Sequence, residues 1–425
     1  MRWATRGVVL AVVFLTVALL GSSGTLQLRE TLARGRSGEC TEVASSPMMI
    51  FVNSLVSWAT GGQVIRQALA ATPQTIKVGY TAPFTGAAAE FGINGWRGIQ
   101  LALEEINAKG ITVGGKRYRV EIVRYDDRCE PTEGVANVRK LVLVDKVVAV
   151  LGSHCSSVCV AVADLLDELK VPGLTIECAA DKVTSPGHPF YFRARPSVGM
   201  MAPLVAPKLV KIFKPKTAGF VAINDDYGRG FVQAFENELS KQGVKTTVKA
   251  FFERGTTDFS VHLTQVKTAA PDIVFYVGVT PEGALILKQA KEFGLTPRIK
   301  FIGSEEMSEM EMLKAAGADV LEGTYSIALW GSVPQQFADR VKKKFGAPMH
   351  YAIIYGYDAM WAVARAIEKA QSLDPVKIRD AMKRIQFQGL QGFIKFEDFN
   401  GYKNQGRYSP WLIQWVKGER KVVKE

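Results

Sequence analysis

A short stretch of the chain, GSHCSSVC at residues 152–159, gathers side chains that could do chemistry. It contains one histidine and two cysteines, so a cysteine nucleophile with an imidazole base is the first hypothesis to consider. Such a nucleophile needs a base within hydrogen-bond reach and a further group that orients the base. These groups usually come from distant parts of a chain, so adjacency is weak evidence for catalysis. A secreted cysteine hydrolase is therefore a secondary hypothesis, and it requires Cys155 to be a free thiol.

The elements on either side of this stretch predict a loop between a strand and a helix. Residues 147–152 form a short apolar run rich in β-branched side chains, whereas residues 158–170 repeat their apolar positions at helical spacing. Ser156 and Ser157 are then placed at the helix N-terminus, where unpaired backbone N–H groups and a partial positive charge face outward. The pattern indicates an anion-binding site in preference to a catalytic one.

The composition is that of an ordinary globular protein with a basic surface. The 425 residues favour two domains, and 47% hydrophobic residues is enough for normal cores. The 53 lysines and arginines exceed the 41 aspartates and glutamates, a balance that could suit nucleic acid or an anionic surface. However, these residues are scattered, and no zinc finger, RNP motif or basic helix accompanies them. We therefore expect no nucleic-acid partner.

The N-terminal part predicts export. Two arginines precede an apolar run at residues 8–20, and small residues follow, so residues 1–24 are expected to be a signal peptide or an uncleaved anchor. Residues 25–74 form an extension, or the true start lies within them and a second signal occupies residues 48–70. Both interpretations start the folded part near Thr75. They also predict a periplasmic protein in which disulfides are permitted.

From Thr75 onward, short β-rich runs alternate with amphipathic helical patterns. This alternation predicts βαβ units and parallel sheets covered by helices on both faces, so the fold class is α/β. The alternation begins afresh after Pro196, which predicts two similar doubly wound, Rossmann-like lobes. A ligand cleft is expected between the carboxyl ends of their strands.

Motifs for cofactors are missing from the sequence. Neither G-x-G-x-x-G nor a P-loop follows any predicted strand, so nucleotide binding is not expected. The chain has four histidines, which are widely separated and show no paired metal-ligand spacing: His154, His188, His262 and His350. We expect structural or surface roles for them, with no metal and no cofactor.

Several loops together resemble a known family. The chain from Thr75 to its end resembles the type I periplasmic solute-binding proteins of branched-chain amino acid ABC transporters, the leucine/isoleucine/valine-binding class. The matching segments occur in family order across about 350 residues: IKVGYTAPFTGAAAEFGINGWRGIQLALEEINAKG, YDDRCEP, LGSHCSS, NDDYGRG, TDFS, PDIVFYVG, KFIGSEE and GFIKFEDFNG. Any one segment alone is a weak signal, but the ordered set is specific.

The resemblance implies two doubly wound lobes joined by three crossings, near Pro196, Tyr325 and Gly389. The lobe boundaries that follow are residues 75–196 plus 326–388 for lobe 1 and residues 197–325 plus 389–425 for lobe 2. The resemblance also implies that Cys129 and Cys155 form a disulfide, which would make this cysteine structural.

Roles for several binding residues are implied by the same resemblance. Ser156 is similar to the serine that binds the ligand carboxylate together with the helix N-terminal amides. Tyr227 resembles the aromatic residue of the far lobe that covers the ligand, and Glu305 resembles the acid that faces the ligand ammonium. Phe91 stands where the family often has tyrosine. Each role has a simpler alternative: a helix cap for Ser156, lobe packing for Tyr227 and a salt bridge at the cleft rim for Glu305.

The sequence departs from the family pattern after the next predicted strand. Ala179 stands where a hydroxyl residue usually helps to hold the ligand, and Glu177 and Cys178 are larger than expected. His154 replaces what is often an apolar residue. Cys178 could pair with Cys159 or be a free thiol in the cavity wall. These departures bear on the identity of the ligand.

We therefore expect a monomeric, non-catalytic receptor that captures an amino acid, branched-chain or similar, and delivers it to the membrane permease subunits of an ABC transporter. The alternatives are an aromatic or aliphatic carboxylic acid as the ligand, or a sensor role for a receptor kinase. The predicted ligand-binding residues are Phe91, His154, Cys155, Ser156, Cys178, Ala179, Tyr227 and Glu305.

Overall fold

A computed structural model describes residues 74–330 and 333–423 of the chain. All the described residues belong to one compact unit. The predicted signal peptide, the alternative start and the extension lie outside the described residues, except that Gln74, the last residue of the predicted extension, begins the first strand. Among those that are described, no helix is both long and apolar enough to cross a membrane.

Lobe 1 is built on an eight-stranded sheet with the strand order β14-β15-β6-β5-β4-β1-β3-β2. Its inner strands pair in parallel, whereas β2 and β14 at the edges pair antiparallel to their neighbours. The strands are β1 (Gln74–Ala82), β2 (Ile111–Val113), β3 (Lys116–Asp126), β4 (Val150–Leu151), β5 (Gly173–Thr175), β6 (Tyr191–Arg193), β14 (Glu397–Phe399) and β15 (Tyr402–Gln405).

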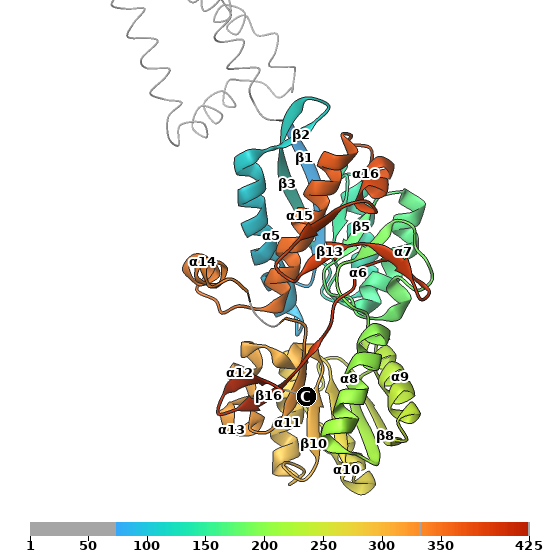
Figure 1. Cartoon of the computed structure of the whole chain (residues 1–425), viewed down its shortest axis with the longest axis vertical. Coiled ribbons are helices and arrows are strands. Elements are labelled where there is room, and N and C mark those ends of the chain that lie inside the picture. Colours follow the sequence, from blue (N-terminus) through green and yellow to red (C-terminus); the bar gives the residue numbers. More distant parts are fainter. Residues whose placement is uncertain (1–73, 331–332, 424–425) are drawn as a thin grey trace, which may run out of the picture. The chain divides into compact units, whose positions relative to one another are not determined.

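Helices cover this sheet, and two of them approach each other closely (Figure 1). Gly98 and Gly356 lie where these two helices cross, and a Cβ on either glycine would collide with the backbone of the partner helix. The two helices are α5 (Ala89–Lys109) and α15 (Tyr351–Ala370). The other elements of lobe 1 are α6 (Pro131–Leu143), α7 (Ser156–Leu169), η2 (Asp181–Val183), α14 (Gln335–Phe345), α16 (Pro375–Met382) and the two-stranded sheet of β12 (Gln386–Gln388) and β13 (Phe393–Lys395).

Lobe 2 is built on a seven-stranded sheet with the order β17-β16-β11-β10-β9-β7-β8. The central strand β9, IVFYV, is buried at every position because helices cover both faces of the sheet. The strands are β7 (Thr217–Ile223), β8 (Lys245–Phe252), β9 (Ile273–Val277), β10 (Lys300–Gly303), β11 (Tyr325–Ala328), β16 (Trp411–Val416) and β17 (Glu419–Val422). The helices are α8 (Val198–Phe213), α9 (Asp226–Lys241), α10 (Ser260–Ala269), α11 (Thr280–Glu292), η3 (Glu305–Ser308), α12 (Met310–Ala316) and α13 (Ala318–Leu321). The predicted α/β class is confirmed.

The chain passes between the two sheets three times, and the structure corrects where the last passage lies. The first lies between β6 and α8, the second between β11 and α14, and the third between β15 and β16. The second is a few residues later than predicted because β11 belongs to lobe 2. The third was predicted near Gly389, but β14 and β15 still belong to the sheet of lobe 1.

A buried polar network explains this later crossing. Gln405 accepts hydrogen bonds from Arg193 Nε at 2.7 Å and from Thr184 Oγ1 at 3.0 Å. Gln405 and Arg193 are both fully buried, so the strand that carries Gln405 must stay beside β6 to satisfy them. These partners are more than 200 residues apart in the sequence, so no local pattern indicated them.

Candidate functional site

A cavity of about 40 Å³ lies between the two lobes, close to the carboxyl ends of several parallel strands. In open α/β sheets this is where ligands bind. The lining from lobe 1 consists of Ala88, Phe91, His154, Cys155, Ser156 and Glu177. The lining from lobe 2 consists of Ile223, Asp225, Tyr227, Arg254, Gly278, Val279 and Glu306.

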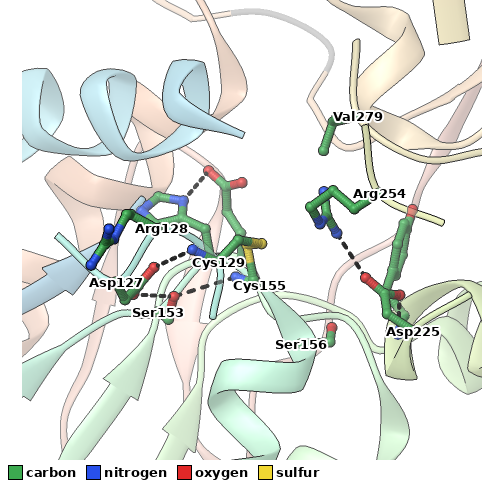
Figure 2. The surroundings of a disulfide bond; sticks show 12 residues. Asp127, Arg128, Cys129, Ser153, Cys155, Ser156, Asp225, Arg254 and Val279 are labelled. Atoms are coloured by element: carbon green, nitrogen blue, oxygen red, sulfur yellow. Dashed lines mark hydrogen bonds and ion pairs between the residues drawn. A yellow bond between two sulfur atoms is a disulfide. The ribbon is translucent and has the colours of Figure 1, made fainter. Parts of the chain in front are cut away.

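The helix α7 begins in the serine loop, where the sequence predicts a helix N-terminus. Ser156 is the first residue of α7, and the helical ladder begins with Cys159 N–H donating to Cys155 O at 3.0 Å. Ser156 Oγ accepts hydrogen bonds from the backbone N–H groups of Ala179 and Ala180, each at 3.1 Å. The hydroxyl proton is therefore available for another acceptor. Figure 2 shows Ser156 facing Asp225 and Arg254 across the cavity.

A disulfide and a buried carboxyl group hold the loop that leads into α7 (Figure 2). Cys129 is bonded to Cys155, with their Cα atoms 5.4 Å apart, as the resemblance implied. Asp127 accepts hydrogen bonds from Ser153 Oγ at 2.7 Å and from the Cys129 N–H at 3.0 Å. Burial raises the pKa of Asp127 above its usual value. Because Cys155 is in a disulfide, it cannot act as the free thiol that a cysteine hydrolase requires.

A second disulfide joins Cys159 to Cys178 and resolves the alternative left open for these residues. Cys178 is fully buried and is not part of the cavity lining. Ala179 also lies behind the lining, where its backbone N–H supports Ser156. Of the predicted ligand-binding residues, Cys178 and Ala179 therefore do not face the cavity with their side chains.

His154 and Glu177 form a buried pair in the wall of lobe 1. His154 Nδ1 lies 3.1 Å from Glu177 Oε1, and His154 Nε2 lies 2.7 Å from the Tyr80 hydroxyl. Tyr80 donates its own proton to Gly92 O at 3.1 Å, so its oxygen accepts from the imidazole. The hydrogen bond to Tyr80 holds the imidazole at the cavity edge, whereas His154 Nδ1 and Glu177 Oε1 lie close together without forming a hydrogen bond.

On the side of lobe 2, Asp225 caps α9 and also holds an arginine. Its Oδ1 accepts from Tyr227 N at 2.9 Å and Gly228 N at 3.0 Å, while its Oδ2 accepts from Arg254 Nη2 at 2.8 Å. Arg254 Nη1 is buried and has no hydrogen-bond partner. The cavity therefore contains a guanidinium donor that is not used by the protein.

Tyr227 lines the cavity and donates its hydroxyl proton to Glu306 Oε2 at 2.9 Å. Ser304 Oγ also donates to Glu306 Oε2, at 2.8 Å. Burial raises the pKa of Glu306 well above its usual value, and the nearby Glu305 carboxylate adds to this effect. Burial and the neighbouring carboxylate therefore both disfavour the ionised form of Glu306.

Glu305 does not line the cavity, in contrast to the place that the resemblance implied for it. Its carboxylate pairs with Arg195 Nη2 at 2.5 Å, and both side chains are fully buried. Consecutive residues of the short helix η3 point in different directions, so Glu306 faces the cavity and Glu305 faces the lobe junction.

Sequence reasoning did not assign ligand-binding roles to several of the lining residues. In the sequence, Glu177 differs from the family pattern only by its size, and Asp225 is one residue of the segment NDDYGRG. Arg254 follows β8 in a loop without any recognisable motif, so the sequence carried no signal for it. Its role depends on the position of Asp225, which comes from another loop.

Comparisons with known proteins agree with this architecture. The sequence profile of the family described as periplasmic binding protein matches residues 75–419. The chain is 30% identical over 350 residues to an amino acid binding protein of Pseudomonas aeruginosa, which covers 78% of this chain and 91% of that protein. It is also 30% identical over 339 residues to a leucine-, isoleucine-, valine-, threonine- and alanine-binding protein of the same organism, with 78% and 88% covered.

A solved structure is similar over nearly its whole length. The crystal structure of a leucine-binding protein from Thermotoga maritima matches with a TM-score of 0.74 and 27% sequence identity. The match covers 82% of this chain and 98% of that protein. The described part of the chain thus has both the sequence profile and the two-sheet architecture of these proteins.

Proposed function

The chain belongs to the periplasmic binding protein family, and from this premise we propose that it is an extracytoplasmic solute-binding protein of an ABC transporter. It captures a small ligand between its lobes and delivers the ligand to the permease subunits as a monomer. The observation that carries this proposal is the cavity lined by both lobes at the carboxyl ends of their strands. A ligand that contacts both lobes favours the closed arrangement over the open one.

We propose an amino acid, branched-chain or similar, as the ligand. The N-terminus of α7 and the Ser156 hydroxyl suit a carboxylate, because backbone N–H groups and the helix dipole favour an anion there. Phe91, Ile223 and Val279 give the cavity apolar surface for a hydrophobic side chain. The names of the relatives from Pseudomonas aeruginosa support the same ligand class.

The acidic groups of the cavity support an ammonium on the ligand. Glu306 replaces Glu305 in this proposal, because Glu305 already has Arg195 as its partner. An ammonium near Glu306 would supply the countercharge that this buried carboxyl lacks and would lower its raised pKa. Glu177 is a second carboxylate in the lining, on the opposite lobe.

A carboxylic acid without an amine is the second candidate for the ligand. Two observations favour it: Ala179 offers no side-chain hydroxyl beside the α7 N-terminus, and Arg254 Nη1 is an unused donor for an additional acceptor. Such a ligand would leave Glu306 protonated, as its raised pKa allows.

A matched pair of ligands tests both candidates. Leucine and 4-methylpentanoate share a carboxylate and an apolar chain, but only leucine carries an ammonium. We expect leucine to raise the melting temperature of the protein, because a ligand that binds only the folded state stabilises it. Binding of 4-methylpentanoate or benzoate with no binding of leucine would identify the second candidate. Failure of a panel of amino acids and simple acids to bind would contradict the proposed function.

A further inference from the structure

A second group of polar side chains lies at the lobe junction but is not part of the cavity lining. Glu309, Glu311 and His350 each place one potential ligand atom within 4.8 Å of those of the other two. The atoms Glu309 Oε2, Glu311 Oε2 and His350 Nε2 are buried and have no hydrogen-bond partner. Buried polar atoms without partners are rare in folded proteins, and three that converge indicate a missing partner.

These residues come from different lobes. Glu309 follows η3 and Glu311 lies in α12, both in lobe 2, whereas His350 is the N-cap residue of α15 in lobe 1. Glu309 and His350 are fully buried. A group bound among these three residues would therefore connect the two lobes.

The Glu309 carboxylate is oriented by its neighbours in a way that leaves one oxygen free. Its Oε1 accepts from Trp330 Nε1 at 2.8 Å and from Ser308 Oγ at 3.3 Å, and Arg420 Nη1 lies 3.8 Å away. All these contacts are made to Oε1, and Oε2 is the atom without a partner. Metal-binding carboxylates are typically held by outer hydrogen bonds of this kind.

We propose that Glu309, Glu311 and His350 form a binding site for a divalent transition-metal cation such as Zn²⁺. An imidazole nitrogen with two carboxylate oxygens is a donor set that zinc accepts, with water at the remaining position. Mg²⁺ and Ca²⁺ prefer all-oxygen sites and should bind more weakly. The cation also offsets the repulsion between the buried Glu309 carboxylate and the half-buried Glu311 carboxylate. The guanidinium groups near these carboxylates are those of Arg420 and Arg97.

Cation binding changes one hydrogen bond of the protein. His350 Nδ1 accepts from the Ala352 N–H at 3.0 Å, so the neutral ring carries its proton on Nε2. When the cation binds Nε2, this proton leaves that nitrogen and moves to Nδ1, and the bond from Ala352 is lost. The backbone amide of Ala352 is therefore a spectroscopic reporter of the proposed site.

The proposal is tested by titrating Zn²⁺ into the untagged, chelator-treated protein in the absence of any amino acid. We expect His350→Asn to weaken zinc binding at least about tenfold, since it removes the imidazole but keeps a residue that can cap a helix. Glu311→Gln, at a half-buried position, should have a similar effect without disturbing the fold. Thermal unfolding of each variant verifies that it is folded.

A matched control uses the other group of potential ligands in the described residues, Asp164, Asp167 and His188, which lies at the surface. His188→Asn should leave the zinc affinity of the proposed site, which is expected to be the tightest site of the protein, unchanged. Equal zinc affinity in the wild type and in His350→Asn, or no zinc binding to the wild type, would overturn the proposal. The titration contains no amino acid, so its result does not depend on whether leucine binds. A failure of the zinc proposal can therefore be distinguished from a failure of the proposed function.

The coupling of the two sites rests on the proposed function. Because the cation connects both lobes, it should favour the closed state and tighten leucine binding, and leucine should tighten zinc binding by the same factor. Leucine affinity that is the same with and without Zn²⁺ in the wild type would contradict this bridging role.

Discussion

At the scale of single residues, Ser156 has two tasks in the structure. Its oxygen accepts two backbone hydrogen bonds from the loop after β5, and its proton is free for a ligand. The same side chain therefore shapes the cavity wall and offers a donor next to the α7 N-terminus. Replacing it removes both functions, and each has its own measurable consequence.

We predict that Ser156→Ala weakens binding of a carboxylate ligand by about 1–3 kcal/mol, as expected for the loss of a hydrogen bond to a charged group. The free energy of unfolding should also fall, because the N–H groups of Ala179 and Ala180 lose their acceptor. Calorimetry and urea unfolding measure the two effects. Ser157→Ala, at the next position outside the lining, is the matched control. Unchanged ligand affinity in Ser156→Ala would place the ligand elsewhere.

A second residue-scale prediction concerns Glu306. Glu306→Gln keeps an acceptor for the Tyr227 hydroxyl but removes the negative charge. If the ligand is an amino acid, leucine affinity should fall by at least about tenfold, because the ammonium loses its countercharge. Affinity for 4-methylpentanoate should stay the same or rise, so this acid is the control ligand. Calorimetry with both ligands decides, and an unchanged leucine affinity would refute the assignment of Glu306.

At the scale of elements, a buried ion pair connects η3 of lobe 2 with the segment that follows β6 of lobe 1. Arg195 Nη2 donates to Glu305 Oε1 at 2.5 Å, and Arg195 Nη1 donates to Glu177 O at 2.7 Å. Arg195 lies at the first crossing between the lobes, where the chain leaves β6 for α8. Arg195 thus holds the backbone at Glu177 and the side chain of Glu305, which precedes Glu306 of the cavity lining.

We predict that Glu305→Gln lowers the free energy of unfolding by about 3–5 kcal/mol, because Arg195 keeps a buried charge without a partner. Urea unfolding measures the loss. The comparison variant is Glu133→Gln. The ion pair between Glu133 and Arg128 is exposed, so its loss should lower the free energy of unfolding by only about 0–1 kcal/mol. A loss for Glu305→Gln as small as that for the comparison variant would contradict the role of the pair.

At the scale of the whole molecule, the two lobes also meet through a titratable group. Thr280 at the start of α11 donates to the Glu90 carboxyl in α5, so this contact joins lobe 2 to lobe 1. Burial raises the pKa of Glu90 to about 8, with smaller contributions from nearby carboxylates, although the hydrogen bond from Thr280 acts in the opposite direction. When the lobes separate, Glu90 becomes solvated and its pKa should return toward 4.5.

This difference predicts a pH-dependent closure. Between pH 4.5 and about 8, the closed form binds a proton at Glu90 that the open form does not. The contribution of Glu90 protonation to the free energy of closure is fully present below the pKa of the open form, near 4.5. It is lost as the pH rises through the pKa of the closed form, about 8. Ligand affinity should therefore fall with rising pH in this window, by at most about tenfold per unit.

Calorimetry in chelator-containing buffers across this range measures the effect. Glu90→Gln can still accept from Thr280 but cannot titrate, so its affinity should depend less steeply on pH. A wild-type affinity that is independent of pH, or an equal slope in Glu90→Gln, would disprove the prediction.

The sequence by itself determined the fold class, because the alternation of β-branched runs with helical spacing reflects local burial that each segment carries in its own residues. It also determined the α7 N-terminus, since the apolar run before residue 152 and the helical spacing after residue 158 leave only the serine loop between them. The ordered motifs identified the family and implied the Cys129–Cys155 disulfide, which the structure contains.

Only the tertiary structure decided which neighbouring side chain faces which partner. The sequence could not separate Glu305 from Glu306, because their roles depend on the direction of a short 3₁₀ turn and on Arg195, which is 110 residues away. It treated His350 as an isolated histidine, because Glu309 and Glu311 reach it only when the two lobes meet. It also placed the last crossing too early, since Gln405 is held in lobe 1 by Arg193. Contacts between distant segments depend on packing, and packing leaves no periodic pattern in the chain.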